Sequence, residues 1–275
     1  MIEKLGAYIR YLEDEEKSQA TRNQYRRDIQ HFFAFVGDAQ VTKKQVIAYK
    51  EMLQGQYQPA SVNAKIAAIN GFFAFIGDAQ LRVKQMKIQK KPFSSKEREL
   101  SKAEYMRLIA AARRQGNEKL ALLIQTICST GIRVSELQFI TAEKVASGEA
   151  MIYLKGKSRT IVIAGKLRKA LRNYLRRTGI TSGPVFVTRS GRPIDRSQIW
   201  KTMKALCQSA GVKREKVFPH NLRHLFARCF YAMDKDIARL ADILGHSSIN
   251  TTRIYIASFG YEHRKCIDAM DLVAL

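Results

Sequence analysis

The stretch from residue 219 to residue 255, PHNLRHLFARCFYAMDKDIARLADILGHSSINTTRIY, organises the rest of the chain. It contains three of the five histidines and ends on a tyrosine. Proline suits the first position of a helix, so a helix is predicted to begin near Pro219. Residues three and four apart are neighbours on a helix, and His220 and Arg223 could therefore point at one anion.

In the same stretch one helix is predicted to end and another to begin. Gly245 reads as the glycine that ends one helix, and Ser247 or Ser248 can cap the next helix, which carries Tyr255. This arrangement predicts that His246 and Tyr255 lie near each other. Histidine, arginine and tyrosine side chains grouped in this way can bind and attack a phosphate, because arginine matches phosphate geometry and histidine moves protons.

The spacing of His220 and His224 allows a second interpretation. Histidines four residues apart can bind zinc, and Cys229 follows nearby. A metal is not expected here, because the HExxH pattern is absent and Arg223, between the histidines, would repel a cation. His224 is expected instead to lie in the core or to support its neighbours.

The composition indicates a folded protein with a polyanionic partner. The 275 residues allow one large or two modest domains, and 48 Lys and Arg against 24 Asp and Glu give a net charge of +24. Nucleic acid is the leading candidate, with a solvated basic surface or anionic lipid as the alternatives. No signal peptide is recognised, and no run approaches the roughly 18 apolar residues of a membrane span. The four scattered cysteines read as reduced thiols, and the protein is expected in the cytoplasm, away from membranes.

The chain is predicted to fold as two domains. Residues 1–88 form a helical domain, since apolar residues recur at helical spacing between cap residues. Within it, FFAFVGDAQ at 32–40 returns as FFAFIGDAQ at 72–80, and these phenylalanines are expected in the core rather than stacked on bases. Residues 89–99 are basic and lack periodicity, which indicates a linker, and residues 100–275 form the second domain.

The second domain contains an arginine at the end of an apolar helix. The helix through residues 120–127 is expected to be central core, Thr130 and Gly131 end it, and Arg133 begins a new turn. An arginine beside the core needs a partner or an anion, and Glu136 stands one turn later. A simple salt bridge between Arg133 and Glu136 is the alternative interpretation.

A hairpin is predicted after this helix. Residues 150–164, AMIYLKGKSRTIVIA, are two β-rich runs around Gly156, which would place Lys155 and Lys157 at or beside the tip. Lysines in turns are normally just solvated. Three further elements are predicted beyond it: a basic amphipathic helix at 166–177, a short strand at 184–188 and a helix at 194–210.

Taken together, these motifs resemble the tyrosine recombinase or phage integrase family. The resemblance rests on histidine, two residues and arginine at 220–223, on leucine-glycine-histidine at 244–246, and on the tyrosine nine positions after that histidine. The stretch 130–137, TGIRVSEL, resembles the family's first arginine box, and the region before residue 90 resembles its helical core-binding domain. The fold so implied is mainly α, a two-domain DNA clamp with an N-terminal helical domain and a mixed, mostly helical catalytic domain that contains a small β-hairpin.

The resemblance implies a site-specific recombinase that cleaves and rejoins DNA by transesterification through a 3′-phosphotyrosine, with no metal, ATP or other cofactor. Two arginines would neutralise the phosphate and donate to its non-bridging oxygens. In the family a lysine on such a hairpin protonates the leaving oxygen; Lys155 is favoured here, and Lys157 is the alternative. The implied catalytic residues are Tyr255, Arg133, Lys155, His220, Arg223 and His246, supported by Glu136.

The resemblance also implies double-stranded DNA as the partner and a homotetramer on paired sites, with accessory DNA-binding proteins as further partners. The tail at 261–275 would dock on the neighbouring protomer, or else pack within its own chain. A nicking-closing topoisomerase of the type IB mechanism and a non-catalytic DNA-binding regulator with the same fold are the alternative functions. Whether the reaction is integration, excision, inversion or dimer resolution stays open. The basic residues expected to contact DNA are Arg22, Arg26, Arg27, Lys43, Lys44, Lys157, Arg192, Arg196 and Lys201.

Overall fold

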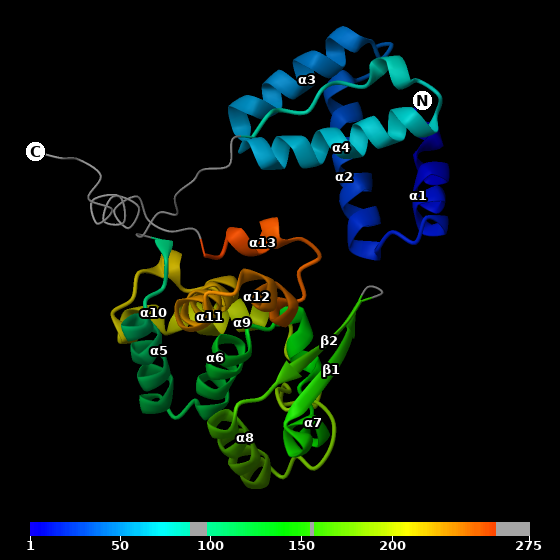
Figure 1. Ribbon diagram of the computed structural model, residues 1–275. Coiled ribbons are helices and arrows are strands. Elements are labelled where there is room, and N and C mark those ends of the chain that lie inside the picture. The colour runs from blue at the N-terminus through cyan, green and yellow to red at the C-terminus, as the bar shows by residue number, and fades with distance from the viewer. Residues whose placement is uncertain (89–97, 155–156, 257–275) are drawn as a thin grey trace, which may run out of the picture. The chain divides into compact units, whose positions relative to one another are not determined.

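The structure is a computed structural model that describes residues 1–88, 98–154 and 157–256. The chain divides into two compact units, Met1–Lys90 and Lys91–Leu275, and each is described by itself (Figure 1). Most of the linker predicted at 89–99 lies outside the described residues.

Helices α1 to α4 build the described part of the first unit. The Ser18 hydroxyl accepts from the Thr21 amide at the start of α2, and Thr42 forms a capping box with Gln45 at the start of α3. Pro59 occupies the first turn of α4, as proline prefers. The bounds are α1 (Leu5–Asp14), α2 (Gln19–Val36), α3 (Lys43–Gln56) and α4 (Pro59–Phe75), with 3₁₀ turns at Ile2–Lys4 and Ala79–Leu81.

The repeated aromatic segments contribute to the core of the first unit. Phe32, Phe72 and Phe73 are fully buried, and Phe32 packs edge-on against Phe73 with ring centroids 5.8 Å apart. The prediction that the repeated phenylalanines lie in the core is confirmed for these residues. It is wrong for Phe35 and Phe75, which are 42% and 37% exposed, because a surface helix buries only one side.

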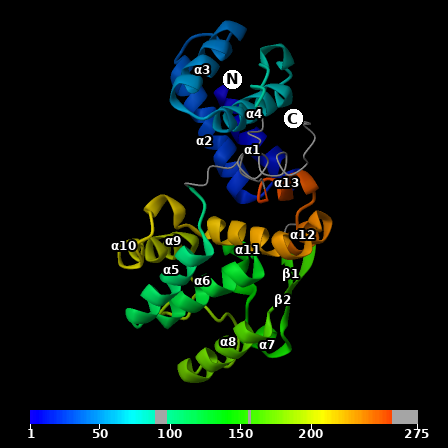
Figure 2. The ribbon, with the colours of Figure 1, turned by 60° about the vertical axis from the view of Figure 1, so that its left-hand side comes forward.

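The second unit is organised around α6 (Glu118–Thr130), whose buried side chains include Leu123 and Ile127. Helix α6 packs against α5, α8 and α11. Figures 1 and 2 place α8 at one end of this unit and α12 with α13 at the other. The other helices are α5 (Lys102–Arg114), α7 (Ala142–Ser147), α8 (Gly165–Thr178), α9 (Arg196–Ala205), α10 (Cys207–Ala210), α11 (Pro219–Asp234), α12 (Ile237–Leu244) and α13 (Ile249–Arg253).

The predicted hairpin is present. Strand β1 (Glu149–Leu154) pairs antiparallel with β2 (Lys157–Val162), and Ile152 stands opposite Arg159. Ile152 is buried and Tyr153 is exposed, so one face of the hairpin packs on the core. The prediction of a mostly helical chain with a small sheet is confirmed. None of the helices in the described ranges has both the length and the apolar character that crossing a bilayer requires.

Two elements differ from the prediction. The strand predicted at 184–188 is reduced to the isolated bridges Thr141–Pro184 and Val187–Pro193, because a proline lacks the amide that would extend a ladder. The helix predicted at 194–210 is divided at Leu206 into α9 and α10. Neither change alters the elements that carry the candidate residues of 219–255.

Candidate active site

Helix α11 begins at Pro219 and carries His220 and Arg223 within its first two turns. His220 Nε2 lies 3.1 Å from the hydroxyl oxygen of Tyr255. The Arg223 guanidinium carbon lies 5.8 Å from the centroid of the Tyr255 ring. Both side chains therefore reach the same tyrosine, although it follows more than thirty residues later.

The end of α12 and the start of α13 bring His246 to this tyrosine. Gly245 ends α12 with a φ of +62°, and Ser248 rather than Ser247 caps α13. The ring centroids of His246 and Tyr255 are 5.1 Å apart. The prediction that the two residues are neighbours is confirmed.

Tyr255 is buried, and its ring rests on His224. The two rings stack with centroids 4.2 Å apart and planes 18° apart. His224 also meets the His220 ring edge-on, at 5.0 Å between centroids. Of the two positions expected for His224, the structure shows the one that supports its neighbours.

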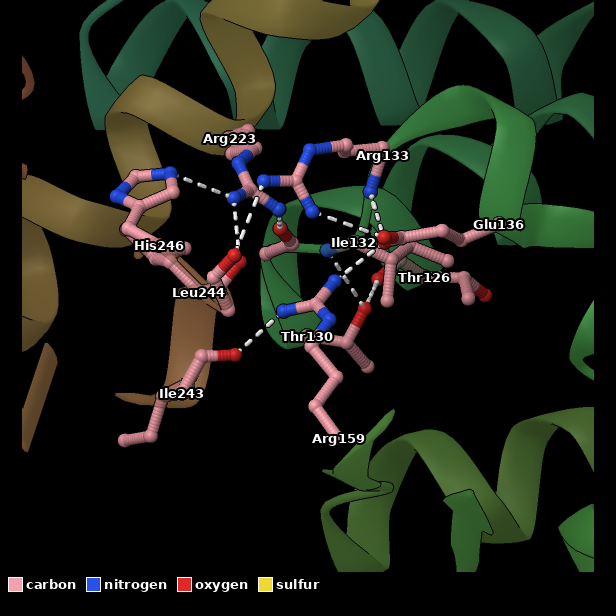
Figure 3. A network of polar contacts seen from close by, with 12 residues as sticks. Thr126, Thr130, Ile132, Arg133, Glu136, Arg159, Arg223, Ile243, Leu244 and His246 are labelled. Carbon is pink, nitrogen blue, oxygen red and sulfur yellow. Dashed lines mark hydrogen bonds and ion pairs between the residues drawn. The ribbon is translucent and has the colours of Figure 1, made fainter. Parts of the chain in front are cut away.

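Arg223 is only 1% exposed, which is unusual for an arginine, and its hydrogen bonds explain how the fold accommodates it (Figure 3). Nη1 donates to the Gly131 carbonyl, and Nη2 donates to the Leu244 carbonyl at 2.7 Å and to His246 Nε2 at 2.9 Å. Gly131 and Leu244 stand at the C-terminal ends of α6 and α12, where helix carbonyls carry partial negative charge. Among the described residues, Nε of Arg223 has no partner. Burial and the charge of Arg133 lower the pKa of Arg223 to about 10, so it stays protonated at neutral pH.

Gly131 combines a constrained backbone with close packing. Its φ of +64° lies in the left-handed region that favours glycine. A Cβ at this position would lie 2.4 Å from Cδ1 of Phe226. Any side chain here would displace the Phe226 ring or the carbonyl that receives Arg223.

The first arginine box contains the ion pair that its spacing indicated. Arg133 precedes the 3₁₀ helix Val134–Phe139, and its amide donates to Glu136 Oε2 at 2.7 Å while its Nη1 donates to Oε1 at 2.9 Å. Burial alone would raise the pKa of Glu136, but the hydrogen bond from the Arg133 amide, the charge of Arg159 and the side-chain hydrogen bonds from both arginines outweigh burial and lower that pKa. Nη2 of Arg133 donates to the Gly245 carbonyl at 3.3 Å. The Arg133 side chain is still 38% exposed, so its guanidinium is accessible to a ligand.

Arg159 on β2 belongs to the same network and was missed by the sequence reasoning. Its Nη2 forms an ion pair with Glu136, and its Nη1 donates to the Ile243 carbonyl (Figure 3). The side chain is 9% exposed. A signal was present, because alternate residues of a strand share a face and Arg159 alternates with the buried Ile161. An arginine on the buried face of a strand requires a partner.

The histidines of the site are neutral at neutral pH. Burial and then nearby arginines lower the pKa of His246 to about 4. Burial, followed by His220 and Arg223, lowers the pKa of His224 to about 4, and burial also lowers the pKa of His220. Because arginine only donates, His246 Nε2 accepts from Arg223, and the ring proton lies on Nδ1, which donates to Thr252 Oγ1 at 2.9 Å.

A cleft of about 830 Å³ opens beside His246 and the first arginine box. Its lining includes Arg133, Arg159 and His246, together with the serine and threonine residues Ser135, Ser158, Thr160, Ser247 and Thr251. The carboxylates of Glu136 and Asp242 also line the cleft. Arg133 and Arg159 pair with Glu136, whereas the guanidinium of Arg223 donates only to carbonyls and a histidine, and this third positive charge favours an anion such as phosphate. Within the described ranges, no three His, Cys, Asp or Glu side chains gather closely enough to hold a metal ion.

The residues predicted to contact DNA fall into two groups. Some make contacts within the first unit: Arg22 pairs with Glu13, Arg27 donates to Gln24 Oε1 at 3.0 Å, and Lys43 donates to the Gln80 carbonyl at 3.0 Å. The others whose side chains are described are exposed on the surface: Arg26, Lys44, Arg192, Arg196 and Lys201.

The side chains of the two candidate lysines and the C-terminal tail lie outside the described structure. Lys155 and residues 261–275 lie outside the described residues. Lys157 is described only as the first residue of β2. Their roles therefore stay predictions.

Both units match sequence families. Residues 98–261 match the phage integrase family, and residues 5–80 match the phage integrase N-terminal SAM-like domain. Tyrosine recombinase XerC of Neisseria gonorrhoeae is 28% identical over 272 residues, which cover 90% of this chain and 88% of that protein.

Solved structures show the same likeness. The crystal structure of XerA recombinase aligns with a TM-score of 0.56 and 26% identity over 99% of each chain. A lambda integrase tetramer bound to a Holliday junction aligns with a TM-score of 0.71 and 19% identity over 91% of this chain and 75% of that chain, a likeness of fold. These matches confirm the prediction of a tyrosine recombinase enzyme. The match to the phage integrase family covers more than half of the residues of this chain, and the chain therefore belongs to that family.

Proposed function

We propose that this chain is a site-specific DNA recombinase that cleaves and rejoins DNA strands through a covalent 3′-phosphotyrosine on Tyr255. The proposal rests on the position of the Tyr255 hydroxyl, which lies 3.1 Å from His220 Nε2 and beside Arg223 and His246. A phosphodiester repels a nucleophile until its charge is neutralised. The arginines of the site supply that neutralisation next to the attacking oxygen.

In the first step the Tyr255 oxygen bonds to phosphorus while the bond from phosphorus to the 5′ oxygen breaks. His220 is neutral and within hydrogen-bond reach, so Nε2 can take the phenol proton. The accessible guanidinium of Arg133 can donate to the non-bridging oxygens. Nε of Arg223 is a second donor, because it has no partner within the described structure. His246 orients the Arg223 fork by accepting from Nη2.

The leaving 5′ oxygen needs a proton, and Lys155 is the proposed donor, with Lys157 as the alternative. The phosphotyrosine keeps the bond energy of the cleaved diester. The 5′ hydroxyl of a partner strand can therefore attack it and restore a phosphodiester without ATP. In this scheme the arginines perform the charge neutralisation that a metal ion performs in other phosphoryl-transfer enzymes.

The proposed partner is double-stranded DNA, held as in a clamp by residues 1–88 as the core-binding domain and residues 100–275 as the catalytic domain, with residues 89–99 as the linker. The exposed basic residues of both units support this role. A homotetramer on paired sites is proposed by analogy with lambda integrase, whose solved structure is a tetramer bound to a Holliday junction. Residues 261–275 would dock on the neighbouring protomer, accessory proteins would join at the site, and the reaction would take place in the cytoplasm.

Covalent trapping tests the proposal. Nicked suicide duplexes taken from the sequence that flanks the gene are incubated with the wild type and with Tyr255→Phe, in EDTA, and resolved on denaturing gels. We expect a DNA adduct with the wild type and none with the variant, because phenylalanine lacks the attacking oxygen. A gel-shift control should show equal DNA binding by both proteins.

Other outcomes point elsewhere. An adduct from Tyr255→Phe would move the nucleophile to another residue. Intact binding with no adduct from either protein, over the whole panel of duplexes, would favour the non-catalytic regulator. Relaxation of supercoiled plasmid without strand exchange would favour the topoisomerase.

A further inference from the structure

Glu136 is shared between two arginines that come from different elements. Its Oε1 receives Nη1 of Arg133, and its Oε2 receives both the Arg133 amide and Nη2 of Arg159. Glu136 is buried, and its partner Arg159 is only 9% exposed, so this ion pair is shielded from water. The carboxylate therefore fixes the position of Arg133 relative to Arg159 on the hairpin.

Arg159 also reaches the end of α12. Its Nη1 donates to the Ile243 carbonyl, and its side chain lies so close to Gly245 that a Cβ there would be 2.5 Å from Cδ of Arg159. His246 follows directly, and its backbone depends on the turn at Gly245. One side chain of β2 thus touches both the first arginine box and the turn that precedes His246 (Figure 3).

We infer that Arg159 is a positioning residue that holds Arg133 and His246 at a fixed separation across the cleft. This role rests on the proposed function, because it concerns the same phosphate site. Both Nη groups of Arg159 already donate to protein acceptors, and its buried Nε has no partner among the described residues. The two Nη contacts are those through which Arg159 acts on Glu136 and the α12 turn. Without it, Glu136 would hold Arg133 alone, and the turn at Gly245 would lose its contact with the hairpin.

The test compares single-turnover cleavage by the wild type, Arg159→Met and Arg133→Ala on the suicide duplex that the wild type cleaves. Misplacing a phosphate ligand by about 1 Å costs roughly 10²-fold in rate, so Arg159→Met should cleave about 10²-fold more slowly than the wild type. Each reaction is repeated with a methylphosphonate at the scissile position, which carries no negative charge. Most of the deficit of both variants should then disappear, because there is less charge for the arginines to neutralise.

Arg168→Met is the matched control. Arg168 also donates to two backbone carbonyls, those of Val145 and Ala146. It belongs to α8, and this helix lies at the end of the unit away from α12 and α13 (Figures 1 and 2). This variant should cleave like the wild type. Arg159→Lys can keep the pair with Glu136 but reaches one acceptor only, so its rate should fall between those of the wild type and Arg159→Met. A deficit of Arg159→Met that is equal on both substrates would mean a general loosening of the fold and would overturn the inference.

A second comparison separates positioning through Glu136 from direct contact with the phosphate. If Arg159 acts through Glu136, the double variant of Arg159→Met and Glu136→Gln should be no slower than the slower single variant. If the rate deficits of the two single variants multiply in the double variant, or if Arg159→Met cleaves at the wild-type rate, the positioning role is rejected. Neither result would reject the proposed recombinase function. A wild type that cleaves none of the duplexes would instead reject the proposed function.

Discussion

Buried charge is arranged differently in the two units. In the first unit Asp28 is buried, and its carboxylate accepts from Lys65 Nζ and from Gln24 Nε2, each at 2.8 Å. In the second unit Arg133 and Arg159 share the carboxylate of Glu136, and Arg223 donates only to backbone carbonyls and a histidine. A buried charge that is paired with an opposite charge is already neutralised. A buried cation that has only neutral acceptors can still bind an anion. The first cluster stabilises a fold, and the second prepares a binding site.

The largest expected effect comes from Arg223→Lys, which keeps the charge of the site and removes the fork of donors. Loss of one donor at a developing charge costs roughly 10²- to 10³-fold in rate, and we expect adduct formation to slow by that amount. Arg107→Lys is the matched control, because Arg107 also donates to carbonyls at a helix end, those of Ala210 and Gly211, but away from the tyrosine. Single-turnover trapping and thermal unfolding are measured for both. Equal trapping rates for Arg223→Lys and Arg107→Lys would show that Arg223 has a structural role only, like the buried charge of the first unit.

Asp28→Ala should give the opposite result. Leaving the partners of a buried acceptor unsatisfied costs about 1–3 kcal/mol, so unfolding of the first unit should move to lower temperature. Cleavage measured well below that temperature and at saturating protein should be unchanged, because Asp28 is buried within the first unit and the candidate active site belongs to the second. Calorimetry and trapping on the same preparation check both parts. Slower cleavage without lost stability would show that this pair is more than structural.

The smallest effect concerns pH, since the cationic site also keeps its histidines neutral. The pKa values of His224 and His246 are lowered from the usual 6.5 to about 4, so the unfolded chain takes up protons first as the pH falls. Their contribution to stability should be constant above pH 6.5 and decline between pH 6.5 and 4. His224→Phe removes one of these titrations and keeps a ring beneath Tyr255. Its unfolding temperature should fall less steeply over this window, and a parallel decline would contradict the assignment to His224.

Two predictions that depended on residues within one turn succeeded, whereas Arg159 and the strand at 184–188 depended on partners that lie further along the chain. The stop at Gly245 and the pairing of Arg133 with Glu136 involve residues within one turn, so the sequence shows both partners together. Arg159 was missed because Glu136 and Ile243 stand 23 and 84 residues away along the chain. The strand predicted at 184–188 is reduced to isolated bridges, because Pro184 and Pro193 lack amide hydrogens and because the bridge partner Thr141 cannot be identified from the local pattern.

Gly131 contributes no functional group, yet it restricts how this enzyme can diverge. Its backbone conformation excludes most residues, and the Phe226 ring occupies the space that a methyl group would need. In a library of all single substitutions selected for recombination, position 131 would accept fewer replacements than the exposed Gln138 a few residues on. Phe226 is the position where compensation would arise, because a smaller side chain there relieves the crowding. Substitutions at Gly131, at the end of α6, and at Phe226 of α11 are therefore expected to depend on each other, because both affect the carbonyl that receives Arg223.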